Sequence, residues 1–283
     1  MADNPLRQYF RQPALYLKLP TLGRWYDGSE VRTNDDAEIA IYGLSAVDDI
    51  MLNTPDAMLN GKALENVVKN CAPDVLNVKK ILVPDLESIF LGIKMATNGG
   101  KYEVERKCPK CNHENNFEVN CAHLLDTMSY IEDSDTQVRF GEQLEINIRP
   151  YTFEMRQIFM QRQFEEERTL RMIDENNTVI DEFEKARILA ESVEKLSRMT
   201  FDLVSRSIQR VTLLQEGVDV TDPEQISEWL ININKQQADI VIDTVNKLNE
   251  VGPKRSVQAT CSACSHQWEE NLNFDPVSFF GKR

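Results

Sequence analysis

Four of the six cysteines in this sequence form two copies of one short motif, and they are the side chains best suited to chemistry. The first copy reads Cys108-Pro109-Lys110-Cys111, and the second reads Cys261-Ser262-Ala263-Cys264. Two residues between the paired cysteines let the backbone turn so that both sulfurs face one point. Two such pairs complete a tetrahedral shell of four thiolates around zinc. We therefore predict one structural zinc (Zn2+) site with Cys108, Cys111, Cys261 and Cys264 as its ligands.

The long separation of the two pairs leaves other arrangements open. A run of 149 residues (112 to 260) lies between Cys111 and Cys261, whereas compact zinc sites have about 15 to 20 residues there. The pairing therefore rests on the likeness of the two motifs. An iron–sulfur cluster, a reduced set of thiols without metal, and two separate sites are the alternatives. A catalytic zinc keeps an open position beside three protein ligands, and no residue pattern here indicates one.

Other histidines and cysteines lie close to these motifs. His113 and His266 each follow two residues after the second cysteine of a pair, and we interpret them as rings outside the metal shell or exposed to solvent. Cys121 and His123 form a Cys-x-His pair that we expect to consist of ordinary core or surface residues.

Alternating segments flank both cysteine motifs, and this pattern predicts the elements that position the sulfurs. Residues 102–106 and 117–121 surround the first motif, and residues 257–259 and 268–274 surround the second. A period of two around a tight turn is typical of a β-hairpin. We therefore predict one zinc ribbon that is split into two hairpins by a large inserted domain.

The fold class predicted for the chain is α+β, with a mixed N-terminal region and a ribbon split by a mainly helical insertion. We divide the sequence into an N-terminal arm with short helices (1–100), the first half of the ribbon (101–121), an inserted helical domain with a β-hairpin (122–252), and the second half of the ribbon with a C-terminal tail (253–283).

The N-terminal region is expected to contain short elements. Residues 1–30 favour an extended arm whose aromatic side chains pack on their own domain or dock on another subunit. The next elements expected are a strand at 38–42, a helix capped by Ser45, a helix that starts at Thr54-Pro55, a helix at 62–71 with Cys71 in the core, and a helix from Asp85 to Asn98.

The insertion is expected to be a helical domain that buries its own apolar stripes. We predict a hairpin at 138–148, a helix from Thr152 to Ile173, a helix at about 181–198, a third helix through Phe201, Val204 and Ile208, a fourth that starts at Asp222-Pro223, and a last one with its stripe at 240–248. The apolar tail at 274–280 either packs on the body or reaches a partner, and we favour the partner.

Charge and composition restrict the function. The chain of 283 residues carries 32 basic and 46 acidic side chains, for a net charge of −14. This charge disfavours nucleic-acid binding, because phosphate contacts need lysine and arginine. A stretch of 18 apolar residues is absent from the sequence, and the N-terminus lacks the apolar core of a signal peptide. We expect no membrane association and a cytoplasmic location.

The sequence does not indicate an enzyme. It contains no Gly-rich phosphate loop, no H-E-x-x-H helix and no G-x-S-x-G elbow. Two of its three histidines lie beside cysteines, which leaves little for a Ser-His or Cys-His arrangement. Adjacent acidic residues such as Glu165, Glu166 and Glu167 are typical of a solvated face in so acidic a chain.

A succession of residues in the first 120 positions resembles the baseplate hub and hub-assembly proteins of T4-like, contractile-tailed bacteriophages. It consists of Leu19-Pro20 with Gly23 and Tyr26, Glu38-Ile39-Ala40-Ile41, Asn60-Gly61, Cys71, Asp85, Gly100-Lys101-Tyr102 and Cys108-Pro109-Lys110-Cys111. The likeness lies in order and spacing, and Thr21 stands where that family usually has serine. The second cysteine pair lies beyond the matched region.

This resemblance implies a non-enzymatic phage protein that helps to build the baseplate hub through contacts with other hub and tail proteins. It also implies a host-cytoplasmic location during assembly, with the virion tail baseplate as a further location. The alternatives are a zinc-ribbon accessory protein of nucleic-acid machinery, which would bind DNA or RNA with a steep salt dependence, and a metal-dependent enzyme, which would need an open metal site in a cleft.

Overall fold

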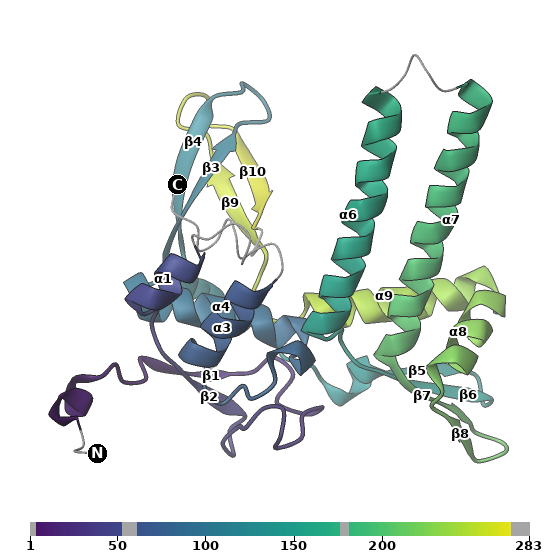
Figure 1. Ribbon diagram of the computed structural model, residues 1–283, viewed down its shortest axis with the longest axis horizontal. Helices are drawn as coiled ribbons and strands as arrows, with labels where there is room; N and C mark the ends of the chain where they lie inside the picture. Colours follow the sequence, from purple (N-terminus) through teal and green to yellow (C-terminus); the bar gives the residue numbers. More distant parts are fainter. Residues whose placement is uncertain (1–3, 53–60, 176–180, 273–283) are drawn as a thin grey trace. The chain divides into compact units, whose positions relative to one another are not determined.

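The computed structural model describes residues 4–52, 61–175 and 181–272 (Figure 1). The chain separates into two compact units, one made of Met1–Tyr130 with Val251–Arg283 and the other of Ile131–Glu250. The predicted α+β class is confirmed, with a mixed N-terminal region and a ribbon split by a mainly helical insertion. Among the described residues, no helix is both long and apolar enough to cross a membrane.

The first unit combines short helices with three two-stranded antiparallel sheets, β1–β2, β3–β4 and β9–β10. Its elements in chain order are η1 (Pro5–Tyr9), β1 (Leu15–Lys18), β2 (Glu38–Ile41), α1 (Ala46–Leu52), α3 (Lys62–Cys71), η2 (Val78–Lys80), α4 (Val83–Asn98), β3 (Lys101–Lys107), β4 (Glu114–Asn120), α5 (Cys121–Asp126), β9 (Ser256–Thr260) and β10 (Gln267–Asn271).

Helix α4 is the centre of this unit. It begins with proline at its first turn, where the missing N–H would have no intrahelical partner. Every residue from Val83 to Ile93 is buried, so neighbours cover it on all sides. It ends at Gly99, whose φ of 75° is the left-handed conformation that favours glycine. The strand of the first hairpin follows at once, so the core helix sets the starting point of the ribbon.

A buried carboxylate fixes the segment after β1 to α4. Asp85 accepts hydrogen bonds from the backbone N–H of Thr21 (3.0 Å), from the Thr21 hydroxyl (2.5 Å) and from the Tyr26 hydroxyl (2.5 Å). Burial raises the pKa of Asp85 to about 6, because it disfavours the charged form more than these hydrogen bonds favour it. The cluster explains why polar residues lie in an otherwise apolar core.

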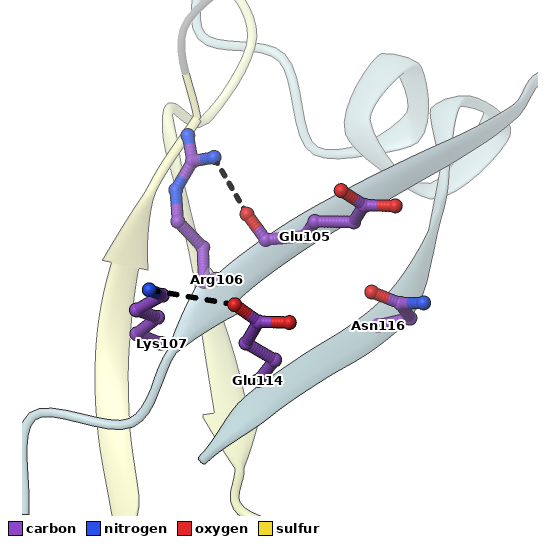
Figure 2. Close-up of a pocket in the computed structure, with 5 residues that line it drawn as sticks. All are labelled: Glu105, Arg106, Lys107, Glu114 and Asn116. Carbon is purple, nitrogen blue, oxygen red and sulfur yellow. Dashed lines mark hydrogen bonds and ion pairs between the residues drawn. The ribbon is translucent and has the colours of Figure 1, made fainter. Parts of the chain in front are cut away.

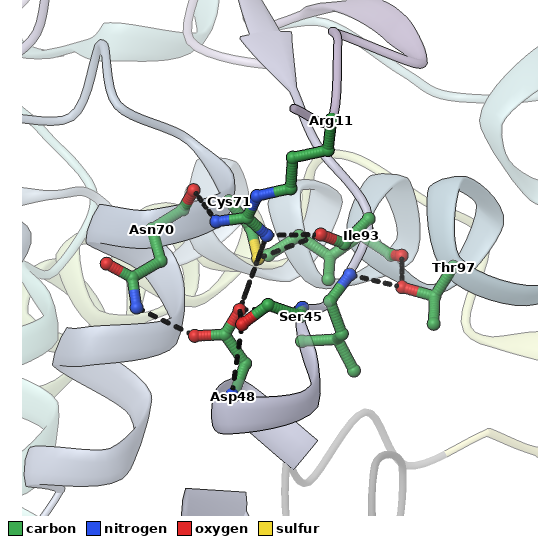
Figure 3. Close-up of polar contacts among 9 residues, drawn as sticks. Arg11, Ser45, Asp48, Asn70, Cys71, Ile93 and Thr97 are labelled. Atoms are coloured by element: carbon green, nitrogen blue, oxygen red, sulfur yellow. Dashed lines mark hydrogen bonds and ion pairs between the residues drawn. The ribbon is translucent and has the colours of Figure 1, made fainter. Parts of the chain in front are cut away.

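A second polar cluster holds the base of the N-terminal arm (Figure 3). Arg11 donates to the carbonyls of Gly43 (2.5 Å) and Asn70 (2.7 Å), and it lies 3.3 Å from the buried Asp48 carboxylate. Asp48 also accepts from the Ser45 hydroxyl at 2.7 Å. Arg11 thus anchors the N-terminal arm to the rest of the first unit.

The arm packs on its own unit only in part, and docking of its aromatic side chains on another subunit stays a prediction. Leu17 and Leu19 are buried in their own unit, whereas Tyr9, Phe10 and Tyr16 are exposed. The described part of the arm therefore combines core residues with aromatic rings that solvent reaches.

The chain leaves the first unit and returns to it at adjacent positions. The backbone N–H of Ser129 donates to the Gly252 carbonyl (3.0 Å), and the Gly252 N–H donates to the Ser129 hydroxyl (3.1 Å). Three residues after Gly252, the Arg255 guanidinium lies 2.8 Å from the carboxylate of Glu87, which is buried on α4. These contacts bring the returning strand to the core from which the first hairpin departs.

The second unit is a four-stranded antiparallel sheet in the order β5-β6-β7-β8, with helices. Its elements are η3 (Asp133–Thr136), β5 (Gln137–Phe140), β6 (Leu144–Ile148), α6 (Phe153–Glu175), α7 (Glu182–Ser207), β7 (Ile208–Leu213), β8 (Val218–Val220), α8 (Pro223–Asn232) and α9 (Lys235–Glu250). Strand side chains such as Ile146 and Val211 and helix side chains such as Leu230 and Val245 form its core.

Two expectations for the insertion are wrong. The third predicted helix does not exist, because α7 continues without a break to Ser207 and Ile208 begins strand β7 beside β6. The apolar stripe of α7 is not core over its whole length, since Leu189 and Val193 are exposed. The predicted hairpin at 138–148 is present, and the sheet extends it by two strands.

Some predicted features lie outside the described residues. They are the helix start at Thr54-Pro55, Asn60 of the succession that carries the family resemblance, and the apolar tail at 274–280.

Candidate metal centre

The four predicted ligand residues lie together in the first unit. The sulfur atoms of Cys108, Cys111, Cys261 and Cys264 all lie within 4.8 Å of one another. The Sγ of Cys108 is 3.7 Å from that of Cys264, and the Sγ of Cys111 is 3.6 Å from that of Cys261. A disulfide requires about 2.05 Å, so these sulfurs are thiols. The arrangement also excludes two separate sites.

Both cysteine turns have the same backbone. In the first, the Asn112 N–H donates to the Cys108 carbonyl (2.9 Å) and the Cys108 N–H donates to the His113 carbonyl (2.9 Å). The second repeats these contacts through Ser265, Cys261 and His266 at 3.0 and 2.9 Å. Asn112 and Ser265 hold positive φ angles of 57° and 56°. Two equivalent turns therefore present their sulfurs to one point from opposite sides.

The sulfurs do not ionise independently. Burial raises the pKa of Cys261, but backbone N–H groups of Cys264 and Ala263 and the neighbouring thiols lower it to about 6. The His113 backbone lowers the pKa of Cys111, but the neighbouring sulfurs raise it to about 12. A single negative charge on the cluster thus opposes further ionisation. A cation at its centre would remove this opposition, because it favours the thiolate form of every ligand.

Side chains beyond the sulfurs join the two hairpins. Arg106 of β3 donates to the Glu270 carboxylate of β10 at 2.7 Å. Trp268 of β10 donates to the same carboxylate at 3.1 Å. The Trp268 ring meets Phe117 of β4 edge-on, with the ring centroids 6.2 Å apart. The sequence pattern placed these residues on hairpins but did not predict their pairing.

Asn115 is the functional residue that sequence reasoning missed. It is buried, and its amide nitrogen donates to the His113 carbonyl at 2.8 Å. Its amide oxygen accepts from the Ser262 N–H (2.9 Å) and the Ser262 hydroxyl (3.1 Å), and its nitrogen lies 3.7 Å from the Cys261 sulfur. One side chain therefore binds both cysteine turns. Its position four residues after Cys111 gives no signal for this contact.

The other candidate ligands lie outside the sulfur cluster. His113 is exposed, and the His266 ring stacks on Trp268 with the centroids 6.3 Å apart. Cys71 and Cys121 are buried, and burial raises the pKa of each thiol to about 11. His123 is exposed. Cys121 and Cys71 therefore behave as small core side chains rather than as ligands.

A hollow of about 510 Å³ lies beside the first hairpin (Figure 2). Two acidic and two basic side chains line it together with Asn116. Lys107 pairs with Glu114 at 3.4 Å, and Arg106 donates to the Glu105 carbonyl at 2.9 Å. Because charges of both signs meet in this open hollow, it does not select a substrate of one charge.

Comparison with known proteins identifies the family. The family described as T4 bacteriophage base plate protein matches residues 44–281, which is most of the chain. The chain belongs to this base plate protein family. The match covers both cysteine pairs and the insertion between them, so it extends well beyond the first 120 residues that carry the resemblance in the sequence. A search of curated proteins and a search of solved structures found no significant match.

Proposed function

We propose that this base plate family member is a non-enzymatic protein of the baseplate hub or of hub assembly, which acts through contacts with other tail proteins and is stabilised by structural zinc. The observation that carries the proposal is the four-sulfur cluster, built from two turns that are 150 positions apart and within a chain of the base plate family. The role in the hub itself rests on the resemblance of the first 120 residues.

The chemistry of the sulfurs fits zinc. A tetrahedral shell with zinc–sulfur bonds of about 2.3 Å places neighbouring sulfurs about 3.8 Å apart. The sulfur pairs at 3.7 and 3.6 Å agree with this spacing. An iron–sulfur cluster holds its cysteines farther apart, because several iron and sulfide atoms lie between them. Zinc bound by Cys108, Cys111, Cys261 and Cys264 would add folding energy and close the ribbon.

We also propose the division of the chain as an N-terminal region (1–100), two ribbon halves (101–121 and 253–283) and an insertion (122–252). In this arrangement the metal holds both ends of the insertion to the same hairpin pair. The insertion and the arm are then free to supply surfaces for partners. The location that follows is the host cytoplasm during assembly and the tail baseplate in the virion.

Quantitative mass spectrometry of mature particles, beside tail intermediates purified from producing cells, tests the hub proposal. A fixed copy number in mature particles indicates a permanent subunit, and presence only in intermediates indicates an assembly factor. Absence from both preparations overturns the proposal. A filter-binding series with DNA and RNA at increasing salt tests the nucleic-acid alternative, which requires retention that falls steeply as salt rises.

Zinc and hub assembly can be tested separately. Metal analysis of the purified full chain measures the zinc content, and particle composition is measured with wild-type chain and with Cys261→Ser. Loss of both zinc and incorporation supports the coupled proposal. Normal incorporation of a variant without zinc leaves the hub role standing and overturns the structural role of the metal.

A further inference from the structure

The first cysteine hairpin is fixed to the end of helix α4. Strand β3 begins at Lys101, directly after the two glycines that follow the helix. The Cys121 N–H donates to the Gly100 carbonyl at 2.9 Å, which closes the base of this hairpin. Gly100 has a φ of 78°, and a Cβ placed there would lie 3.1 Å from the Cβ of Cys121. The base of the first hairpin is therefore packed closely against α4.

The second hairpin returns to the same helix through one residue. Arg255 directly precedes β9, and its guanidinium lies 2.8 Å from the Glu87 carboxylate of α4. The Arg255 carbonyl accepts a hydrogen bond at 2.6 Å from the N–H of Leu272, the residue that follows β10. Arg255 therefore joins the two strands at the open end of the second hairpin and connects that end to α4.

The burial of Glu87 determines where Arg255 lies. The Glu87 side chain is 6% exposed, on the part of α4 that neighbours cover on all sides, whereas the Arg255 side chain is 37% exposed. Leaving a buried carboxylate without its cation is strongly unfavourable. Movement of the hairpin base away from α4 would separate this pair. The ion pair therefore favours one position of the second hairpin on the helix.

Both hairpins carry the position of their bases to the cysteine turns. Strands β3 and β4 pair in register from Lys101 to Lys107, and β9 and β10 pair from Ser256 to Thr260. The two hairpins lie side by side (Figure 1), and the Arg106–Glu270 contact joins them. Because each hairpin is a continuous ladder, placing both bases on one helix also places both pairs of sulfurs.

We propose that the Glu87–Arg255 ion pair is a positioning contact of the metal centre, which holds the second cysteine turn opposite the first before the metal binds. The inference rests on the proposed zinc site. Glu87 and Arg255 act through the hairpin and supply no ligand atom, so they are positioning residues.

The expected effect of this contact is on metal affinity. Each turn supplies two thiolates, and a metal held by one turn binds the other more readily when that turn is kept nearby. Removing the ion pair gives the second turn more freedom, which binding must then restrict. All four sulfurs remain, so the geometry of the loaded site should not change.

Arg255→Met with a matched control tests the proposal in the full chain. Competition with a chromophoric chelator should show zinc bound about tenfold or more weakly than in wild type. Arg11→Met is the control, because Arg11 is 36% exposed beside the fully buried Asp48 of the same unit but is not attached to either hairpin. It should lose similar stability yet change zinc affinity less than about threefold. Circular dichroism of the metal-free variants verifies that they are folded.

Two further variants keep the test independent of the folding of Arg255→Met. Glu87→Gln should weaken zinc binding to a similar extent, and Glu87→Gln with Arg255→Met should be no weaker than the weaker single variant, because both remove one contact. Arg255→Lys retains a cation beside Glu87, so its zinc affinity should stay within about threefold of wild type.

Cobalt(II) provides a spectroscopic measure of the shell itself. A tetrahedral shell of four thiolates gives cobalt a characteristic visible absorption. At saturation the spectrum of Arg255→Met should equal that of wild type, although a higher concentration of cobalt is needed to reach it.

The outcomes separate this inference from the zinc site. Wild-type chain that binds no zinc overturns the proposed metal centre and this inference with it. If wild type binds zinc but Arg255→Met binds it equally well, or Arg11→Met loses as much affinity, only the positioning role is overturned. Losses that multiply in the double variant show that Glu87 and Arg255 do not act as a pair. A changed cobalt spectrum at saturation means that Arg255 shapes the shell rather than placing the hairpin.

Discussion

Replacing Asn115 with alanine should loosen the metal centre without changing any cysteine. The substitution removes the hydrogen bonds that join the His113 carbonyl to the N–H and hydroxyl of Ser262. Leaving such groups without partners costs about 1 to 3 kcal/mol when they are buried. Ser262 is exposed, so water replaces part of the lost bonding. We therefore expect a loss of about 1 to 2 kcal/mol, toward the lower end of that range.

This loss should appear mainly in metal affinity. Removing a side chain that hydrogen-bonds to the metal ligands typically lowers metal affinity about 10- to 100-fold. A tenfold change in affinity corresponds to about 1.4 kcal/mol. Competition of the zinc-loaded chain with a chromophoric chelator measures the affinity. Asn116→Ala is the matched control, because Asn116 is the next residue on β4 and is exposed. If Asn115→Ala and Asn116→Ala retain zinc equally well, Asn115 does not hold the two turns together.

Three further predictions concern the metal and the two polar clusters of the first unit. Cys264→Ser should lose stoichiometric zinc whereas Cys121→Ser should keep it, as measured by elemental analysis; equal zinc content in both would contradict the four-sulfur site. Arg11→Ala should lower the free energy of unfolding by about 1 to 3 kcal/mol, because it leaves the buried Asp48 carboxylate without its cation. A denaturation midpoint equal to that of wild type would show that the remaining hydrogen bonds to Asp48 are enough to stabilise its charge. Asp85 has a folded pKa of about 6 against an ordinary 3.8, so the folded state holds this proton more tightly. Its contribution to stability is therefore complete below about pH 4 and is lost as pH rises to about 6, and Asp85→Asn should remove up to about 3 kcal/mol of this pH dependence. If the free energy of unfolding changes equally with pH in wild type and in Asp85→Asn across that window, Asp85 is not the source of the pH dependence.

Local patterns in the sequence predicted the ribbon well. Each cysteine pair, with its turn and flanking alternation, is a signal contained within about twenty residues, and both hairpins form as expected. The likeness of the two motifs then indicated their pairing across 149 residues. The same reasoning could not find Asn115, because its partner Ser262 lies 147 positions away and a lone asparagine has no periodicity.

The errors in the insertion also have physical causes. Residues Phe201, Val204 and Ile208 have helical spacing, but Ile208 is β-branched and pairs with Ile148 of β6. Tertiary pairing thus overrides the pattern at the end of α7. For the stripe at Leu189 and Val193, periodicity identifies an apolar face but not what covers it. An exposed stripe such as this one has the same sequence pattern as a core stripe.

The split of the ribbon by a long insertion costs little free energy, and this explains why the metal can connect such distant turns. The entropic cost of closing a loop rises by only about 0.6 kcal/mol for each doubling of its length. Extending a usual ribbon loop to 149 residues is about three doublings, so the added cost is about 2 kcal/mol. Structural zinc in small ribbons contributes several times that amount.

The folded insertion reduces this cost further, because a folded unit with adjacent ends behaves as a short loop. The hydrogen bonds between Ser129 and Gly252 hold those ends together at 3.0 and 3.1 Å. Ser129→Ala should weaken this closure only slightly, since the backbone bond from its N–H remains. A large loss of zinc affinity in that variant would mean that the hydroxyl, rather than the folded insertion, sets the geometry of the ribbon.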